Sequence, residues 1–459
     1  MENDKNTAAV NEVDLNGLNA IPHSMRTMSP MSYSTVLWSS YICVQILTIG
    51  LYLLPPTGVL NITQVIVAAL ISGIIAATMT AINGDPGARY GIPFVMQARV
   101  TFGTKGAKLV GFLRSVPAIC WNGICTWYGA DALCVVCQNV FGFGNTFVFF
   151  FILLIIEAVL SVRGFQTIKW FDSVMSIVIF AILIYFFYYI FSNETVDFRP
   201  AMEFKGSWGL PFIAGIMGGL GNLTTCLLSA GDLTRHIKFK NEGEITKKNT
   251  IFNFIGTLPP YLFMFAAGII VSIATGESNP IVGLAKIAPN PLFAIVLLVF
   301  LMLAQVTSNL SLNILCAGIV FQDVFHLNWK KSIILVTILS VVICPWILQS
   351  SNYFFKVQNA YSCLLGPTVG ILVADYYFFR KKKLNVDDIY EGTKYTYSKG
   401  FSPVAVIALI VGAVASACFF DYSWLVGFPV SLVLYTVLKK CWKIEEKSEA
   451  AQGLVIARK

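Results

Sequence analysis

Residues 292–319 read LFAIVLLVFLMLAQVTSNLSLNILCAGI. The stretch carries no charged side chain and is longer than the roughly 20 apolar residues that cross a bilayer as a helix. Its second half nevertheless holds six polar side chains between Gln305 and Asn313. Polar groups are costly in lipid and usually face a cavity or another helix. The stretch therefore predicts a membrane-spanning helix with a polar, protein-facing middle.

Composition extends this prediction to the whole chain of 459 residues, which is 56% hydrophobic and 12% charged, with a mean hydropathy of +0.71. Soluble chains are about a quarter charged, so soluble, disordered and disulfide-scaffold proteins are excluded. Lipid offers backbone groups no partners, so apolar spans should be helices. We predict an all-α polytopic membrane protein with twelve transmembrane helices. The apolar blocks are 36–54, 63–82, 116–137, 146–162, 172–192, 210–230, 251–274, 292–319, 332–349, 357–379, 402–419 and 424–439.

Basic residues fix the orientation of these spans, because Lys and Arg concentrate in cytoplasmic loops. With both termini inside, all but four of the 32 basic residues lie in inner segments. The exceptions are Arg199, Lys205, Lys286 and Lys356. The net charge of +8 therefore reflects topology, and no nucleic-acid partner is expected. We expect a cytoplasmic tail over 1–30, a transporter domain over 31–440 and a cytoplasmic tail over 441–459, in a monomer of the cell membrane.

Histidine and cysteine argue against an enzyme. The three histidines, His23, His236 and His326, fall in inner segments or at span ends, so no metal centre or hydrolytic triad can form inside the bundle. Most of the eleven cysteines lie within spans, where free Cys acts as a small hydrophobe. No cofactor is expected.

Two spans are predicted to be interrupted. The sixth contains four glycines in the run GIMGGLGN over 215–222, and the first has Ser39, Ser40, Gln45 and Thr48 near its middle. Transporters often bind substrate where such helices unwind at equivalent places of two repeats. The alternative for the glycines is close helix packing through small residues. Turn residues over 83–94 predict an ordered inner loop.

The third and eighth spans carry the remaining candidate groups. Trp121 and Cys125 share a helix face, and a buried Trp needs a partner for its N–H or a flat ligand for its ring. In the eighth span Thr307 and Ser308 share a face that can offer oxygen ligands to Na⁺. Asn309 and Asn313 share another face, on which amides can pair with a heterocycle. On an ideal helix Asn313 points nearly opposite Ala304, so both can line one site only if protein encloses this helix on several sides.

Acidic residues are expected at membrane edges rather than in the middle of spans. They are Asp131, Glu157, Asp172, Asp232 and Asp375. A bundle without a buried acid or base favours a neutral ligand.

Five motifs in order resemble nucleobase:cation symporter family 1. They are GIPFVMQARVTFGTKG over 91–106, WNGICTW over 121–127, DLTR over 232–235, TSNLSLN over 307–313, and LGP at 365–367 followed by ADY at 374–376. The resemblance covers about residues 25–440. It implies a LeuT-type fold of two inverted five-helix repeats plus two C-terminal helices, working by alternating access.

The resemblance also implies site residues. Trp121 would stack on a flat ring and Asn313 would bind its amide edge, while carbonyls and hydroxyls would hold Na⁺. The candidate substrate-binding residues are Gln45, Trp121, Asn122, Cys125, Gly219, Asn222, Leu223, Asn309 and Asn313. The candidate cation ligands are Ser40, Cys43, Ala304, Thr307 and Ser308. The chain departs from the family at Cys125, often Gln or Asn, and at Leu223, usually aromatic. Val44 holds a usually polar position, so Gln45 is expected to replace it.

These observations predict a secondary-active symporter that imports a neutral planar nitrogenous heterocycle with Na⁺ or H⁺. The heterocycle would be a nucleobase such as cytosine, uracil or a purine, or allantoin or hydantoin. The alternative is a permease of the same fold for an amino acid, an amine or a vitamin-type pyrimidine. A channel is disfavoured, because no ring-forming selectivity motif is present.

Overall fold

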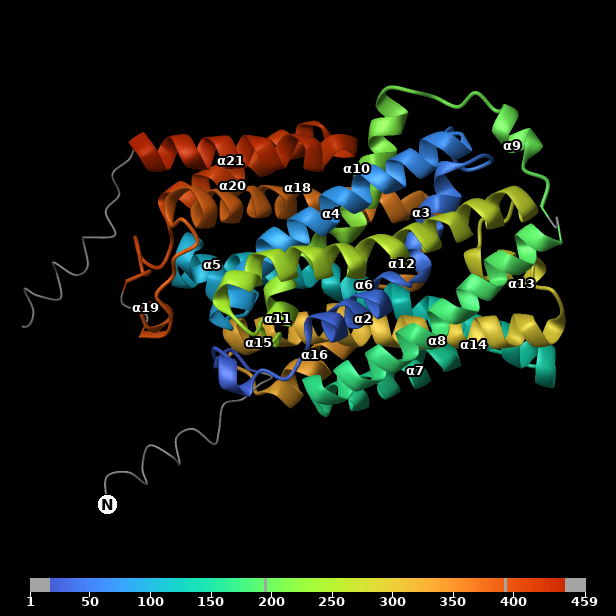
Figure 1. Cartoon of the computed structure of the whole chain (residues 1–459), viewed down its shortest axis with the longest axis horizontal. Coiled ribbons are helices and arrows are strands. Elements are labelled where there is room, and N and C mark those ends of the chain that lie inside the picture. The colour runs from blue at the N-terminus through green and yellow to red at the C-terminus, as the bar shows by residue number, and fades with distance from the viewer. Residues whose placement is uncertain (1–16, 194–195, 392–393, 442–459) are drawn as a thin grey trace, which may run out of the picture.

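The computed structural model describes residues 17–441 except 194–195 and 392–393, and for 165–173, 176 and 351–352 the backbone alone. Within these residues β-pairing is limited to two isolated bridges, Met28–Ile237 and Ser398–Phe401, and all other regular structure is helical. Each of the twelve predicted blocks forms one helix or two or three consecutive helices (Figure 1). The all-α prediction is confirmed.

The helices of the twelve blocks are α2 (Pro30–Tyr41) with α3 (Val44–Leu53), α4 (Ile62–Tyr90), α6 (Thr104–Phe141), α7 (Thr146–Val162), α8 (Phe165–Ser192), α10 (Leu210–Leu228), α12 (Ile245–Thr275), α14 (Pro291–Ser308) with η4 (Asn309–Ile314) and α15 (Leu315–Phe325), α16 (Trp329–Val342) with α17 (Pro345–Leu348), α18 (Ser351–Val373) with η5 (Ala374–Phe379), α20 (Pro403–Cys418) and α21 (Ser423–Cys441). Connecting helices are η2 (His23–Met25), α5 (Phe94–Phe102), α9 (Arg199–Glu203), α11 (Ala230–Thr234), η3 (Glu242–Glu244), α13 (Pro280–Lys286), α19 (Val386–Glu391) and η6 (Phe420–Tyr422). Of the described residues, seven helices and the bent α2–α3 pair are long and apolar enough to cross a membrane; Thr146–Val162, Ile177–Ser192 and Pro403–Cys418 are shorter apolar helices.

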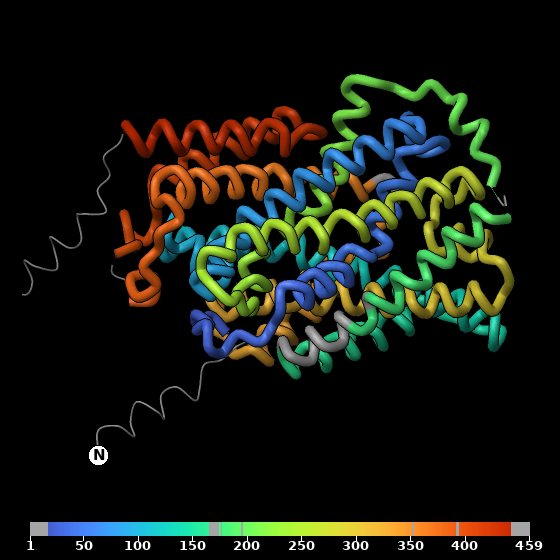
Figure 2. Tube along the Cα trace, viewed as in Figure 1, coloured from blue at the N-terminus to red at the C-terminus, as the bar shows by residue number. Residues whose placement is uncertain are grey.

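The helices form two packed groups around the centre. One contains the α2–α3 pair, α4, α10 and α12; the other contains α6, α7, α14 and α16. Helix α8 packs against α2 and α14, and α20 and α21 pack on α18 at one flank (Figure 1). The first and last described residues lie at the same end of the bundle (Figure 2), as an even number of spans requires.

The first span is broken, as predicted. Helices α2 and α3 meet at an angle of 54° across Ile42 and Cys43, and Cys43 has an extended backbone (φ −138°, ψ 150°). The break frees backbone groups near the centre of the bundle, where the second group of helices faces them.

The sixth span does not break at its glycines, which corrects the prediction. Helix α10 is continuous from Leu210 to Leu228, and its irregularity falls later, at Ser229. A Cβ on Gly219 would lie 2.6 Å from the Tyr261 hydroxyl, and one on Gly218 would lie 2.8 Å from the Phe355 ring. The glycines therefore let α10 approach its neighbours closely.

The prediction of a loop over 83–94 is also wrong, because α4 continues to Tyr90 with Pro86 inside it. Side-chain pairing outweighs the local turn propensity there. Buried Asp85 accepts hydrogen bonds from Arg89 at 2.8 Å and from Tyr376 at 2.7 Å. The helix ends at Gly91, whose φ of 71° suits glycine, and α5 follows.

Residues 17–29 pack against the end of the bundle at which α4 ends. Arg26 donates to the carbonyls of Ile21, Ala88 and Arg89 at 3.1, 2.5 and 3.2 Å. Burial lowers the pKa of Arg26 to about 10, so its guanidinium stays charged at neutral pH. The remainder of the tail expected over 1–30, and nearly all of that over 441–459, lie outside the described residues.

Candidate functional site

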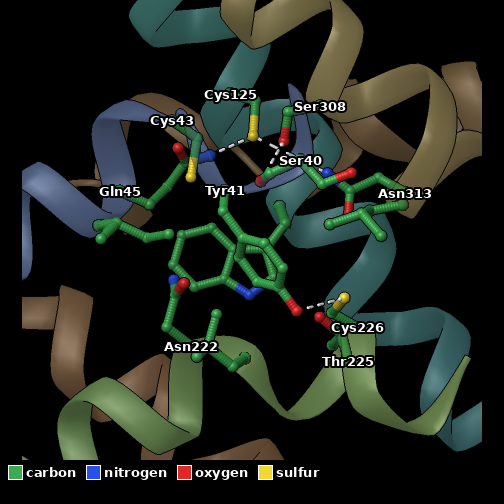
Figure 3. A pocket seen from close by; sticks show the side chains of 14 residues that line it. Ser40, Tyr41, Cys43, Gln45, Cys125, Asn222, Thr225, Cys226, Ser308 and Asn313 are labelled. Carbon is green, nitrogen blue, oxygen red and sulfur yellow. Dashed lines mark hydrogen bonds between the residues drawn. The ribbon is translucent and has the colours of Figure 1, made fainter. Parts of the chain in front are cut away.

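A central cavity lies beside the break in the first span, between the two helix groups (Figure 3). Its free space is about 30 Å³, room for about two water molecules. All lining residues except Asn222 are buried, so the protein is closed around this site, and a heterocycle needs its walls to move. The lining residues are Ser40, Tyr41, Cys43, Gln45, Ile46, Trp121, Cys125, Asn222, Leu223, Thr225, Cys226, Ser308, Leu312 and Asn313.

Three side-chain amides from three elements reach the cavity (Figure 3). Gln45 contacts the Cys125 thiol through Nε2, which leaves its Oε1 without a partner in the described chain. Asn313 donates from Nδ2 to Asn309 Oδ1 at 2.8 Å, and its own Oδ1 makes no hydrogen bond with the described residues. Asn222 makes no side-chain hydrogen bond with them either. These amides offer both donors and acceptors to a polar ring edge.

The apolar wall is built around Trp121. Its indole N–H donates to the Tyr361 hydroxyl at 3.0 Å, and that hydroxyl donates to the Gly221 carbonyl at 3.0 Å. Phe354 packs edge-on against the indole with ring centroids 5.7 Å apart. The ring is thus held by its edge, and Leu223 supplies an aliphatic surface on the same cavity.

Three residues expected to bind substrate lie away from the cavity wall. The Asn122 amide donates to Ser340 on α16 at 2.9 Å. Gly219 packs against Ser72 and Tyr261. Asn309 lies one layer behind Asn313 and bonds to it. The Asn122 side chain therefore points away from the cavity, whereas Gln45 contacts the Cys125 thiol from α3.

Oxygen atoms gather where the break in the first span meets the eighth span. Ser308 Oγ lies 3.4 Å from the Ser40 carbonyl, and the hydroxyls of Ser40 and Ser311 are 3.1 Å apart. Thr307 Oγ1 donates to the Ala304 carbonyl at 2.9 Å. The Cys43 carbonyl accepts from the Ile46 amide at 3.2 Å. Hydroxyls and carbonyls of this kind suit a hard cation such as Na⁺.

A π-helical segment changes which residues of the eighth span share a face, although Ala304 itself does not line the cavity. Helix α14 ends at Ser308, and residues Asn309–Ile314 form the wider π turn η4. In a π turn, residues five apart face the same way, and such segments are frequent at functional sites. Ser308 and Asn313 accordingly line one cavity, although they diverge on an α-helix.

Sequence reasoning missed several functional candidates. Tyr41, Ile46, Thr225, Cys226 and Leu312 line the cavity. Their residue types are common in spans, so nothing in the sequence singled them out.

Charged groups stand behind the cavity wall rather than on it. The lining contains no Asp, Glu, Lys or Arg. Arg114 is fully buried and donates to the carbonyls of Thr225 and Leu312 at 3.3 and 3.2 Å, so it joins α10 to η4.

Glu157, expected at a membrane edge, is fully buried within α7. Asp232 and Asp375 are buried too, whereas the side chain of Asp172 lies outside the described residues. The expectation that spans hold no buried acid is therefore wrong. A lone carboxylate in the apolar run FFFILLIIEAVL was the available signal.

Residues 20–439 match the family of permeases for cytosine/purines, uracil, thiamine and allantoin. The chain belongs to this nucleobase-cation-symport-1 family. It is 27% identical to the allantoin permease of Bacillus subtilis over 418 residues, covering 82% of this chain and 83% of the relative. It is 26% identical to the hydantoin permease of Microbacterium maritypicum over 428 residues, covering 90% and 86%.

The fold is likewise similar to that of Mhp1, a family transporter solved in a closed conformation with bromovinylhydantoin bound. The TM-score is 0.83 at 23% identity, covering 96% of this chain and 98% of that one. The expected LeuT-type fold is confirmed, with twelve spanning helices. Family membership makes the protein a multi-pass membrane transporter and not an enzyme.

Proposed function

We propose that this transporter is a secondary-active symporter that imports a neutral planar nitrogenous heterocycle, such as a nucleobase, allantoin or hydantoin. The observation that carries the proposal is the central cavity itself. The aromatic face of Trp121 stands near three amides with free hydrogen-bonding groups, and the lining carries no formal charge. Flat bases stack on aromatic side chains with about 1–3 kcal/mol each.

The cation is proposed to bind at the oxygen cluster of Ser40, Cys43, Ala304, Thr307 and Ser308. The cluster joins α2 to the end of α14, so a cation there would hold the two helix groups together. Cation and substrate would then favour the same closed conformation, which is the requirement for coupling. Ser308→Ala removes one oxygen ligand and should weaken Na⁺ activation of uptake about tenfold. Na⁺-independent uptake by the unmodified protein would contradict this assignment of the cation site.

We place the protein in the cell membrane as a monomer, with both termini in the cytoplasm. The basic residues support that orientation, because all but four of the 32 fall on one side of the spans. A carboxylate or ammonium substrate would need a charged partner in the cavity, so the amino acid and amine alternatives are less well supported.

Uptake in proteoliposomes tests the proposal. A thermal-shift screen with uracil, cytosine, adenine, hydantoin, allantoin and a thiamine-like pyrimidine, with and without Na⁺, first selects the ligand. Trp121→Ala and Asn313→Ala should then abolish its uptake while membrane expression stays normal. Trp208→Ala, at an exposed loop position, and Asn193→Ala are matched controls that should transport normally. Normal uptake by both cavity variants would refute the assignment.

A further inference from the structure

Glu157 is a buried carboxyl group in the second half of α7 that the proposed transport mechanism does not use. We propose that Glu157 is a proton-binding site whose occupancy is linked to substrate binding through the pair Asn309–Asn313. The inference rests on the proposed function, because it concerns the same cavity, and it adds a titratable group to it.

The surroundings of Glu157 contain no compensating cation. Its side chain is fully buried and pairs only with Thr126 Oγ1 at 2.8 Å and Asn309 Nδ2 at 3.0 Å. No described Lys, Arg or His forms an ion pair with it. The elements packed against α7 are α6, α8, α16 and η4. The titratable group facing Glu157 from α6 is the Cys125 thiol, and the described side chains of the other three place none against it.

Hydrogen counting shows that the site can hold or release a proton without losing its partners. The Thr126 hydroxyl has one hydrogen, yet it lies 2.8 Å from both the Asn122 carbonyl and Glu157 Oε2. When that hydrogen goes to Asn122, the contact with Glu157 needs a proton on the carboxyl group. When it goes to Glu157, the carboxylate is ionised and the contact persists. Rotation of one hydroxyl therefore accommodates both states.

Asn309 connects this proton site to the cavity. Its Nδ2 has two hydrogens for three acceptors, namely the Asn122 carbonyl at 3.1 Å, Thr126 Oγ1 at 3.0 Å and Glu157 Oε1 at 3.0 Å. Its Oδ1 accepts from Asn313 at 2.8 Å, and Asn313 lines the cavity. A change of charge at Glu157 thus redistributes the hydrogens of Asn309, and this acts on the amide that faces the substrate.

The closed conformation sets the sign of the linkage. A buried charge that has no cationic side chain among its described partners is costly, so enclosure favours the protonated carboxyl group. A substrate that also favours the closed conformation therefore binds together with the proton. The proton moves from water to Glu157 Oε2 while the site is open, and it returns to water when the site reopens. Substrate affinity should fall by up to tenfold per pH unit where Glu157 titrates.

The test measures substrate binding and proton uptake by the purified full-length protein in weakly buffered detergent solution. The probe is the heterocycle selected by the thermal-shift screen. At a pH where the carboxyl group of Glu157 is ionised in the substrate-free protein, the unmodified protein should take up close to one proton per bound heterocycle. Glu157→Gln, which keeps an acceptor for Asn309 and mimics the protonated group, should bind with pH-independent affinity and take up none. Glu277→Gln removes a carboxylate that pairs with Lys286 in the 275–291 connection and should behave like the unmodified protein.

Infrared spectroscopy of the substrate-free protein gives a second, independent readout. A protonated-carboxyl band should titrate with pH in the unmodified chain and in Glu277→Gln, and should be missing from Glu157→Gln. Binding of heterocycle without proton uptake, or an unchanged band in Glu157→Gln, would overturn the proton site. Failure of every heterocycle to bind while the band still titrates would contradict the proposed function and leave the proton site supported.

Discussion

The first and sixth spans occupy equivalent places in the two repeats, yet only one of them breaks at the cavity. The first span opens between α2 and α3 and gives Ser40, Cys43 and Gln45 to the cavity. The sixth continues as α10 through four glycines, which touch neighbouring helices, and reaches the cavity only with the segment 222–226. Glycines in a span thus mark close packing, whereas polar side chains at a break mark the site.

The largest effect is expected where the glycine run packs most tightly. Gly219→Leu would force a side chain against Tyr261 and Ser72, whose hydroxyls are 2.9 Å apart. Overpacking of this kind costs about 1–3 kcal/mol or more, so the thermal midpoint in detergent should fall sharply. Gly243→Ala is the matched control, because nothing lies within 4 Å of its added Cβ. Unchanged stability of Gly219→Leu would show that the run does not act through packing.

A substitution beside the break should instead leave the fold intact and weaken substrate binding. Gln45→Leu removes the Oε1 that has no partner in the described protein. Loss of one hydrogen bond to the ligand, about 1.5 kcal/mol, lowers affinity by roughly tenfold. Calorimetric titration and a melting curve on the same sample measure both quantities. Gln138→Leu, at an exposed position near the end of α6, should bind normally. A fall in stability with unchanged affinity would show that Gln45 stabilises the fold and does not bind the substrate.

A smaller loss of affinity is expected from the part of the sixth span that does reach the cavity. Asn222→Ala removes an amide with no hydrogen bond to the described residues, so the folded protein loses little. Loss of a net hydrogen bond of about 0.5–1.5 kcal/mol corresponds to a twofold to tenfold lower affinity for the heterocycle. Competition binding against the unmodified protein resolves this difference. Equal affinities would mean that α10 contributes packing alone.

The smallest effect is expected at Gly221, where an added Cβ would lie 3.3 Å from Ser362 Oγ. Gly221→Ala requires that hydroxyl to move by only a few tenths of an ångström. Stability and uptake should both stay near those of the unmodified protein, as measured by melting curves and initial uptake rates. A collapse of either would show that the run tolerates no side chain at all.

Most of the fold follows from the sequence, because apolar length and basic loops are local properties. The exceptions have tertiary causes. The segment 83–90 is rich in turn residues but stays helical, because Asp85 pairs with Arg89 and Tyr376, the latter far away in the chain. The glycine run stays helical because its neighbours fill the space that side chains would occupy.

The site was harder to predict, because helical spacing shows which residues share a face but not where that face points. Trp121 and Cys125 share a face that meets the cavity, whereas Asn122 turns to Ser340 on α16. The π turn η4 lets Ser308 and Asn313 line one cavity, although the two residues diverge on an α-helix. The burial of Glu157 depends on Thr126 and Asn309, which belong to other spans.

The central claim is that the cavity beside the first-span break holds the heterocycle. The most direct test is a cryo-electron microscopy structure of the purified protein with the heterocycle selected by the binding screen. We predict density for the ring in this cavity, against the Trp121 face and within hydrogen-bond distance of Gln45 or Asn313. A ring bound elsewhere in the protein, with the cavity still closed to about 30 Å³, would contradict the account.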